Sequence, residues 1–313
     1  MSRLIDNIAD FLVANGFELS FQIRHDFDVI VTRTLDGRHT KVILPLEISA
    51  GTIEEAEAES DNAEDAIRMI TREAGYPLII TEDRWRSQRQ MMEARLLAHL
   101  ELFSQAYARN CEIRRIEKTE AQEFLNRNHS YGDAACKYRY GLFLKRHTGH
   151  IAAEMGFPIR SGMTDEVKNL SEGTLIAVAT FSNARRWIKE GKEIRSYEWT
   201  RYASLPDLRV SGGMGKMLKA FIKEVQPDDI MSYADLEWSE GEVYERLGFE
   251  AETRKEPVTF TIDPQTWERT AIRRSPVKPG MTEGDNVIPD LIGDLFFRNF
   301  GSRKFRLKLT DYK

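Results

Sequence analysis

Residues 197–249 read YEWTRYASLPDLRVSGGMGKMLKAFIKEVQPDDIMSYADLEWSEGEVYERLGF and contain the most informative pattern of this chain. The first run of this stretch, 197–204, is expected to form a strand, and a glycine-rich turn follows over 209–215. Apolar residues then recur at helical spacing over 216–225. This order predicts the first half of a βαβ-like unit.

The second half of the stretch completes this unit. Pro227 and the two aspartates after it end the helix, and residues 230–233 are expected to form the second strand. Residues 241–247 are expected to form a short helix that ends at Gly248, because glycine readily takes the left-handed conformation found at helix C-termini. The glycine turn therefore lies between a strand and the N-terminus of a helix.

We interpret the glycine turn as an anion-binding site. A helix N-terminus leaves its first N–H groups unpaired and carries a partial positive charge. Glycine lets the backbone approach a phosphate or pyrophosphate closely, and a lysine would add a point charge. The alternative is a tight turn whose glycines supply positive φ and bind nothing. The residues of this predicted site are Val210, Ser211, Gly212, Gly213, Gly215 and Lys216.

These residues resemble the GNAT superfamily of acyl-CoA-dependent acyltransferases. In that superfamily the loop after the fourth strand reads Q/R-x-x-G-x-G/A and holds the coenzyme A pyrophosphate. Gly213, Gly215 and Leu218 fit the pattern G-x-G-x-x-L, while Arg209 stands one residue out of register. Tyr244, in YERLGF, falls where many GNAT enzymes have a tyrosine that protonates the departing thiolate. The resemblance implies acetyl-CoA or another acyl-CoA as the cofactor.

A narrower resemblance covers roughly residues 76–265. NHSYG, KYRYGLF, EWTRYA and SYADLEWSEGEVYERLGF are similar to a GNAT-like domain of phage homing-endonuclease-like proteins, where it follows a nuclease-type domain. The chain is also similar to the Mom-type phage proteins, which modify adenine in DNA on a GNAT fold. This implies DNA as a partner and a nucleobase or modified base as the acceptor. The matching positions are Ser232, Tyr233, Asp235, Gly241, Tyr244 and Phe249, with Glu198 and Arg201 on the strand.

Three of these positions are candidate catalytic residues. Tyr244 is the candidate general acid toward a thiolate, and is otherwise a core tyrosine on a short helix. Glu198 is the candidate general base, unless it pairs with Arg201. Residues three apart on a strand point to opposite faces, so both can face one cleft only if a bulge intervenes. Asp235 would bind a substrate amine or base edge at the end of its strand, or cap the following turn.

The remaining candidates form the predicted substrate side. His129, in NHSYG, is expected to face the acceptor, with a hydrogen-bonded turn as the alternative role. Arg201, Ser232 and Tyr233 complete the substrate-binding set that the resemblance implies.

Residues 1–108 form a small α/β unit by pattern: helix, β-hairpin, helix, strand and helix. Asp28 and Glu47 lie on consecutive strands, the geometry in which PD-(D/E)xK nucleases hold Mg²⁺. The unit resembles the Vsr mismatch-repair nuclease, most clearly in PLIITEDRW. Glu47 is followed by Ile-Ser-Ala-Gly-Thr, with neither the lysine nor the Trp-His pair of those nucleases. We therefore expect a retained fold with an incomplete catalytic set, and a metal at Asp28 and Glu47 only if the nuclease is active.

Several local expectations complete the pattern. A single long helix is predicted over 84–102, and a capping box of Thr119 and Gln122 is predicted to start the helix over 119–126. Other expectations are loops over 145–172 and 275–290, a connection over 182–192, a short helix over 291–300 and a closing basic strand over 304–309.

Composition fits two domains of ordinary size. The chain has 313 residues, 41% of them hydrophobic, and a formal net charge of −5. No run of about 18 apolar residues predicts a membrane span, and the N-terminus lacks the apolar core of a signal peptide. Two isolated cysteines argue against a disulfide scaffold and a zinc site, and favour the cytoplasm. The predicted domains are 1–108 and 109–313, the second with a basic C-terminal extension.

The predicted fold class is α/β (α+β), with a Vsr-like, PD-(D/E)xK-like domain followed by a GNAT-fold mixed-sheet domain. The predicted function is acyl transfer from an acyl-CoA to a nucleobase or modified base in DNA. The alternatives are a Mg²⁺-dependent endonuclease or DNA-binding accessory protein, and a GNAT-fold enzyme that acts on a small molecule or a protein amine. Basic clusters such as Arg185, Arg186 and Lys189 suit DNA, but each is more often a solvated surface.

Overall fold

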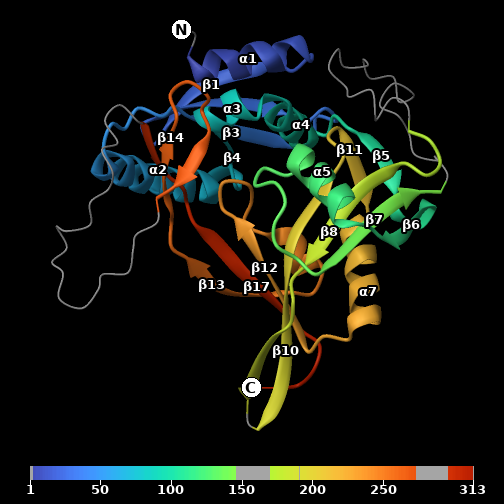
Figure 1. Cartoon of the computed structure of the whole chain (residues 1–313). Helices are drawn as coiled ribbons and strands as arrows, with labels where there is room; N and C mark the ends of the chain where they lie inside the picture. The colour runs from blue at the N-terminus through green and yellow to red at the C-terminus, as the bar shows by residue number, and fades with distance from the viewer. Residues whose placement is uncertain (1–2, 146–169, 190, 273–294, 313) are drawn as a thin grey trace, which may run out of the picture.

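The computed structural model describes residues 3–145, 170–189, 191–272 and 295–312 (Figure 1). Within them the chain has mixed α/β structure, with a four-stranded sheet, an eight-stranded sheet and two smaller sheets. The predicted α/β class is therefore confirmed at this coarse level. The loops predicted over 145–172 and 275–290 lie almost entirely outside the described residues.

The N-terminal unit is a four-stranded sheet of order β1-β2-β3-β4. Strands β2, β3 and β4 bury apolar residues on both faces, because helices cover both sides of the sheet there, whereas the edge strand β1 is largely exposed. Ile30 and Ile43 pack against α1, while Val29 and Val42 pack on the side of α2. Strands β3 and β4 are parallel, and α2 supplies the crossover that a parallel pair requires. The elements are α1 (Leu4–Ala14), β1 (Leu19–Arg24), β2 (Phe27–Arg33), β3 (Thr40–Leu46), α2 (Ile53–Ala74) and β4 (Leu78–Thr81).

The single helix predicted over 84–102 is wrong. Two helices, α3 (Glu82–Ser87) and α4 (Arg89–His99), meet at Gln88, whose backbone leaves the helical region at φ −126° and ψ 38°. Tertiary contacts favour this break. The Gln88 amide donates to the carbonyl of Ser130, and the Arg84 guanidinium pairs with Glu237. Helical periodicity alone does not report such contacts.

The larger sheet has the order β13-β17-β12-β10-β8-β7-β6, with β9 paired on β10. Strands β10 and β12 are parallel neighbours, and α7 connects them, which confirms the predicted βαβ unit. Helix α7 begins at Gly213, earlier than the predicted start at 216. The elements are β6 (Cys111–Arg115), α5 (Lys118–Asn128), β7 (Tyr138–Leu144), β8 (Leu175–Phe181), β10 (Lys192–Ser204), α7 (Gly213–Val225), β12 (Asp229–Asp235), α8 (Glu242–Arg246), β13 (Glu250–Lys255) and β17 (Ser302–Lys308).

Two local expectations about this region are wrong. Residues 185–189 form strand β9 (Arg185–Lys189), although a connection was predicted over 182–192. All five residues of β9 are exposed, so the sequence has no apolar alternation there to indicate a strand. The capping box is also absent, since α5 starts at Lys118 after Glu117 with no side-chain cap.

The C-terminal region differs from the predicted basic extension. Strand β17 lies inside the large sheet, between β12 and β13, and its cations Lys304 and Arg306 pair with Glu252. The described part of the helix predicted over 291–300 is a strand, because Phe296 and Phe297 alternate between partners on either side. That strand, β16 (Leu295–Arg298), joins β14 (Thr259–Ile262) and β15 (Arg269–Ala271) in a small sheet.

Another parallel pair links the two predicted domains. Strand β5 (Ser104–Tyr107), which precedes the short 3₁₀ turn η1 (Ala108–Asn110), pairs with β11 (Leu208–Ser211) next to the glycine turn. The small C-terminal sheet also contacts the N-terminal unit, since Ile48 packs with Phe260 and Ile262.

A buried cluster of charges lies at the junction between these parts. Glu237 is 2% exposed and accepts hydrogen bonds from Arg84 at 2.9 Å and from Arg269 at 2.7 Å. Arg269 also pairs with Asp83. Burial opposes ionisation of Glu237, but Arg269 and Arg84 outweigh it and lower its pKa to about 2. One carboxylate thus binds cations from two distant segments of the chain.

Replacing Glu237 by alanine is expected to destabilise the protein by about 3–5 kcal/mol, because two buried guanidinium groups lose a partner. Urea unfolding followed by circular dichroism measures this change. Glu242→Ala is the control, since Glu242 pairs with Arg246 at 3.9 Å on the surface and its loss should cost under about 1 kcal/mol. Equal stability losses in the two variants would contradict the structural role of the cluster.

Candidate functional site

The candidate site starts where strands β10 and β12 separate. They pair in parallel only from Ser196 to Glu198 on β10 and from Asp229 to Met231 on β12. Beyond these pairs β10 stays with β8, and β12 stays with β17. The carboxyl ends of two neighbouring parallel strands therefore diverge, and such a gap is where open α/β sheets bind ligands.

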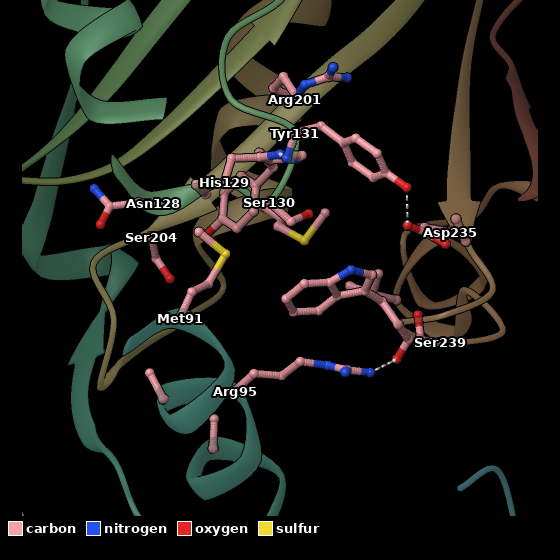
Figure 2. Close-up of a pocket in the computed structure, with 18 of the residues that line it drawn as sticks. Met91, Arg95, Asn128, His129, Ser130, Tyr131, Arg201, Ser204, Asp235 and Ser239 are labelled. Atoms are coloured by element: carbon pink, nitrogen blue, oxygen red, sulfur yellow. Dashed lines mark hydrogen bonds between the residues drawn. The ribbon is translucent and has the colours of Figure 1, made fainter. Parts of the chain in front are cut away.

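A cavity of about 2280 Å³ extends from this fork to the N-terminal unit. Its volume exceeds the range of about 300–1,000 Å³ that is usual for small-molecule pockets, so it has room for two reactants. Figure 2 shows its walls: Met91 and Arg95 come from α4, His129 and Tyr131 from the loop after α5, and Asp235 from the end of β12.

All but one of the residues predicted for the acyl-transfer site line this cavity. The exception is Lys216, whose ammonium donates to the carbonyls of Ala108 at 2.7 Å and Cys111 at 2.5 Å. Its charge holds the start of β6 rather than facing the cavity. The residues that line it are His129, Glu198, Arg201, Val210, Ser211, Gly212, Gly213, Gly215, Ser232, Tyr233, Asp235 and Tyr244.

The turn predicted over 209–215 is wrong over most of its length, because residues up to Ser211 belong to β11 and α7 begins at Gly213, which leaves only Gly212 as a turn. Gly212 precedes α7 with φ 75°, a left-handed conformation that glycine adopts without strain, and no side chain caps the helix. A Cβ on Gly213 would lie 3.0 Å from the Tyr202 hydroxyl, so the backbone here packs closely. The first N–H groups of a thirteen-residue helix thus start at the cavity wall without a side-chain acceptor.

The Tyr244 hydroxyl lies at the fork. It is 2.9 Å from the hydroxyl of Ser232, which also donates to the carbonyl of Trp199 at 3.0 Å. Because serine has a single hydroxyl hydrogen, both bonds form together only when Tyr244 donates to Ser232. Burial raises the pKa of Tyr244, so the phenol keeps its proton at neutral pH. The predicted alternative also holds in part, since the Tyr244 ring packs on Phe305.

Glu198 and Arg201 face the same cavity, because a bulge intervenes between them. The register of β10 against β8 shifts between Trp199 and Arg201. This is the condition under which residues three apart can share a face. The Arg201 guanidinium donates to the carbonyl of Gly132 at 3.0 Å. Burial lowers the pKa of Arg201, and the nearby Glu198 carboxylate partly offsets that effect.

The opposite wall joins Asp235 to the NHSYG loop. Asp235 accepts a hydrogen bond from the Tyr131 hydroxyl at 2.8 Å (Figure 2) and one from the backbone N–H of Glu237 at 3.0 Å. Burial and the Glu237 carboxylate raise its pKa. The substrate-binding and turn-capping roles predicted for Asp235 are therefore compatible. Tyr233 lies on the same strand, with the Lys255 ammonium 4.1 Å from its ring centre.

His129 closes a turn and also lines the cavity. Its Nδ1 accepts from the backbone N–H of Tyr131 at 3.1 Å, which assigns the ring hydrogen of the neutral form to Nε2. Burial, together with Arg201 and Arg84, lowers its pKa to about 4. The ring is therefore neutral at physiological pH, with an N–H available as a donor.

The N-terminal unit contributes residues to the site that local sequence patterns do not predict. Arg95 donates to the backbone carbonyls of Glu237 and Trp238, and its guanidinium lies 4.2 Å from the Trp238 ring centre. The Arg84 guanidinium likewise lies over the Tyr131 ring, 4.8 Å from its centre. These partners lie more than 40 residues apart, so only basic clustering over 84–95 could have suggested them.

Asp28 and Glu47 do come together, but around an arginine. Arg3 lies 2.6 Å from the Asp28 carboxylate and 3.9 Å from that of Glu47, which also accepts from the backbone N–H of Leu4. A metal at this pair would have to displace Arg3. Among the described residues, no group of three or more His, Cys, Asp or Glu side chains is placed to hold a metal ion.

Comparison with known proteins identifies no family. No protein-family model matches the chain, and no curated protein matches it in sequence.

In the described ranges, no helix is both long enough and apolar enough to cross a membrane.

We predict that His129 stays neutral down to about pH 4. The folded-state pKa is below the ordinary 6.5, so between these values the unfolded chain binds more protons and stability falls as pH decreases. His129→Asn should make stability less dependent on pH in this window, because the amide oxygen can replace Nδ1 as acceptor. Part of the pH dependence of stability should remain in this variant, because burial also lowers the pKa of His99, to about 3. NMR titration of the imidazole signals measures the pKa directly, and a His129 midpoint near 6.5 would contradict the prediction.

Proposed function

We propose that this protein is an acyl-CoA-dependent N-acyltransferase of the GNAT type. The observation that carries the proposal is the fork, where β10 and β12 diverge beside the uncapped N-terminus of α7 and the Tyr244 hydroxyl. These features bring the predicted phosphate site and the predicted acid into one cavity. Counted from β6, β10 is the fourth strand of the sheet, in line with the resemblance in sequence.

The residues of the glycine turn suit the pyrophosphate of an acyl-CoA. Backbone N–H groups of Gly213, Met214 and Gly215 begin the helix, and its dipole favours an anion there. The bound donor supplies an activated thioester. Since Lys216 is engaged elsewhere, binding depends on backbone donors and on the helix dipole.

Tyr244 is the proposed general acid. Its raised pKa keeps the phenol protonated, so that it can donate a proton to the thiolate as the thiolate leaves. Ser232 lies within hydrogen-bond reach and connects Tyr244 to the carbonyl of Trp199. This connection holds the phenol in one orientation at the fork.

The acceptor would bind between β10 and the NHSYG loop. Glu198 would accept the amine proton directly or through water, with Arg201 beside it. Asp235 and the neutral His129 offer an acceptor and a donor on the facing wall. We propose a nucleobase or modified base in DNA as the acceptor, following the resemblance to Mom-type proteins. Such a base would have to be flipped out or single-stranded to reach the cavity.

The geometry favours the nuclease alternative less. Its metal site would depend on Asp28 and Glu47, whose carboxylates are engaged by Arg3 and by the N-terminus of α1. A cytoplasmic location remains part of the proposal, in keeping with the two free cysteines.

Gly215→Glu is expected to abolish micromolar binding of acetyl-CoA and free CoA in calorimetric titration. The new carboxylate would repel a pyrophosphate at the helix N-terminus, while the fold should tolerate it. A Cβ at this position lies 3.3 Å from the Leu247 side chain, and an acidic residue suits the first helical turn.

Gly215→Gln is the matched control, because it has nearly the same shape without the charge. It should bind CoA more tightly than the glutamate variant. Absence of CoA binding by the unmodified protein would contradict the proposal, as would equal binding by both variants.

Tyr244→Phe is expected to slow acyl transfer by about 100-fold without weakening CoA binding, because a general acid acts on the leaving group. Thiol release from acetyl-CoA with a single-stranded oligonucleotide measures the rate. Tyr140→Phe is the control, since it also removes a phenol hydroxyl, one that donates to Glu224 at 2.8 Å on a residue that does not line the cavity. Unchanged release by Tyr244→Phe would exclude the assigned acid, and no release by the unmodified protein would argue against DNA as acceptor.

A further inference from the structure

A two-stranded hairpin projects from the large sheet at the end of β10 that lies away from the cavity (Figure 1). Strand β9 pairs with the first residues of β10, from Arg185 opposite Ser196 to Lys189 opposite Lys192. Every residue of β9 is exposed, including Ile188 at 70% and Trp187 at 43%. The acyl-transfer proposal assigns no role to this hairpin.

The hairpin places like charges directly opposite each other. Residues 185–195 include five basic and two acidic side chains. Lys189 is the ladder partner of Lys192, and Arg186 is the partner of Arg195. Like charges in opposed positions destabilise a strand pair, and a lysine–glutamate pair would stabilise it. The positive charge therefore works against the stability of the hairpin.

Neighbouring carboxylates neutralise only part of this charge. Arg186 pairs with Glu193 at 3.2 Å, and Arg195 lies 3.7 Å from Asp228 at the base of the hairpin. The side chains of Arg185, Lys189 and Lys192 form no ion pair with a described acidic residue. A polyanion would supply the missing negative charge.

The surface at the base of the hairpin is basic as well. A hollow of about 580 Å³ lies between the start of α5 and the turn that leads into β9. Its charged lining residues are Lys118, Arg139, Arg185 and Asp133. The positive surface thus continues from the hairpin onto the body of the protein.

We propose that the β9–β10 hairpin binds duplex DNA, with its lysines and arginines on the phosphates and the ribbon in the major groove. The major groove of B-DNA admits a two-stranded ribbon, whereas that of A-form RNA is too narrow. Trp187, which lies on the same face of the ribbon as Lys189 and Lys192, would supply an apolar contact such as that made with a thymine methyl group. This inference depends on neither the glycine turn nor the acyl donor. A second copy of the hairpin is a poor partner, because it would bring cations against cations.

The test compares two double variants that change the net charge equally. Lys189→Gln with Lys192→Gln alters the hairpin, while Arg68→Gln with Arg72→Gln alters exposed positions on α2. Each takes the net charge from −5 to −7, because two positive charges are removed. Fluorescence anisotropy with a labelled duplex of about 20 base pairs, two helical turns, measures binding between about 50 and 200 mM salt.

We expect the slope of log K against log salt concentration to be less negative by about 2 in the hairpin variant than in the unmodified protein, because two phosphate contacts are removed. The hairpin variant should also bind several-fold more weakly. The α2 variant should bind as the unmodified protein does. The melting temperature of the hairpin variant should not fall, because a like-charge pair is removed.

Three results would overturn the proposal. They are no salt-dependent duplex binding by the unmodified protein, equal losses in the two double variants, or a loss in the hairpin variant that is as large for a single strand of the same length as for the duplex. CoA titration of the hairpin variant separates this outcome from failure of the acyl-transfer proposal, because the glycine turn is unchanged.

Discussion

Strands β10 and β12 pair in parallel over only a short length, and the cavity opens where this pairing ends. Hydrogen bonds join the two strands over three residue pairs, and the register of β10 then shifts at a bulge. Because each strand keeps its other neighbour, the sheet remains continuous while a wedge opens between them. In this wedge the Ser232 hydroxyl donates to the Trp199 carbonyl and forms a hydrogen bond with the Tyr244 hydroxyl. Without the bulge, Glu198 and Arg201 would face opposite sides of the strand.

Buried ion pairs decide how the N-terminal unit contributes to the cavity. Arg84 and Arg269 reach Glu237 from distant parts of the sequence, and Arg95 donates to the consecutive backbone carbonyls of Glu237 and Trp238 in the same turn. Removing charges of this kind from water is costly, so such a cluster is stable only when every member is paired. The same turn holds Asp235 against Tyr131. The contacts that attach α3 and α4 to the large sheet therefore also shape the proposed acceptor wall.

Strand β10 connects the two proposed activities. Its first residues form the basic hairpin, and its last residues line the cavity. A rigid strand of this kind fixes the distance between a DNA-binding arm and a reactive centre. The central stacking of Phe181 on Phe221, with ring centres 3.9 Å apart, anchors the sheet against α7 between these ends. A duplex held by the hairpin could thus present one strand to the cavity at a set distance.

Local sequence patterns were enough to predict the βαβ unit, a glycine turn at Gly212 before α7 and most strands, because these follow from periodicity and from the conformational freedom of glycine. The resemblance in sequence also named His129, Glu198, Asp235 and Tyr244 as candidate site residues, and all four line one cavity. Long-range contacts determine that α3 and α4 separate at Gln88, that Lys216 points away from the cavity, and that β17 inserts between β12 and β13. Strand β9 escaped prediction because both of its faces are exposed. In each of these cases the deciding partner lies far away in sequence or is solvent, and local patterns record neither.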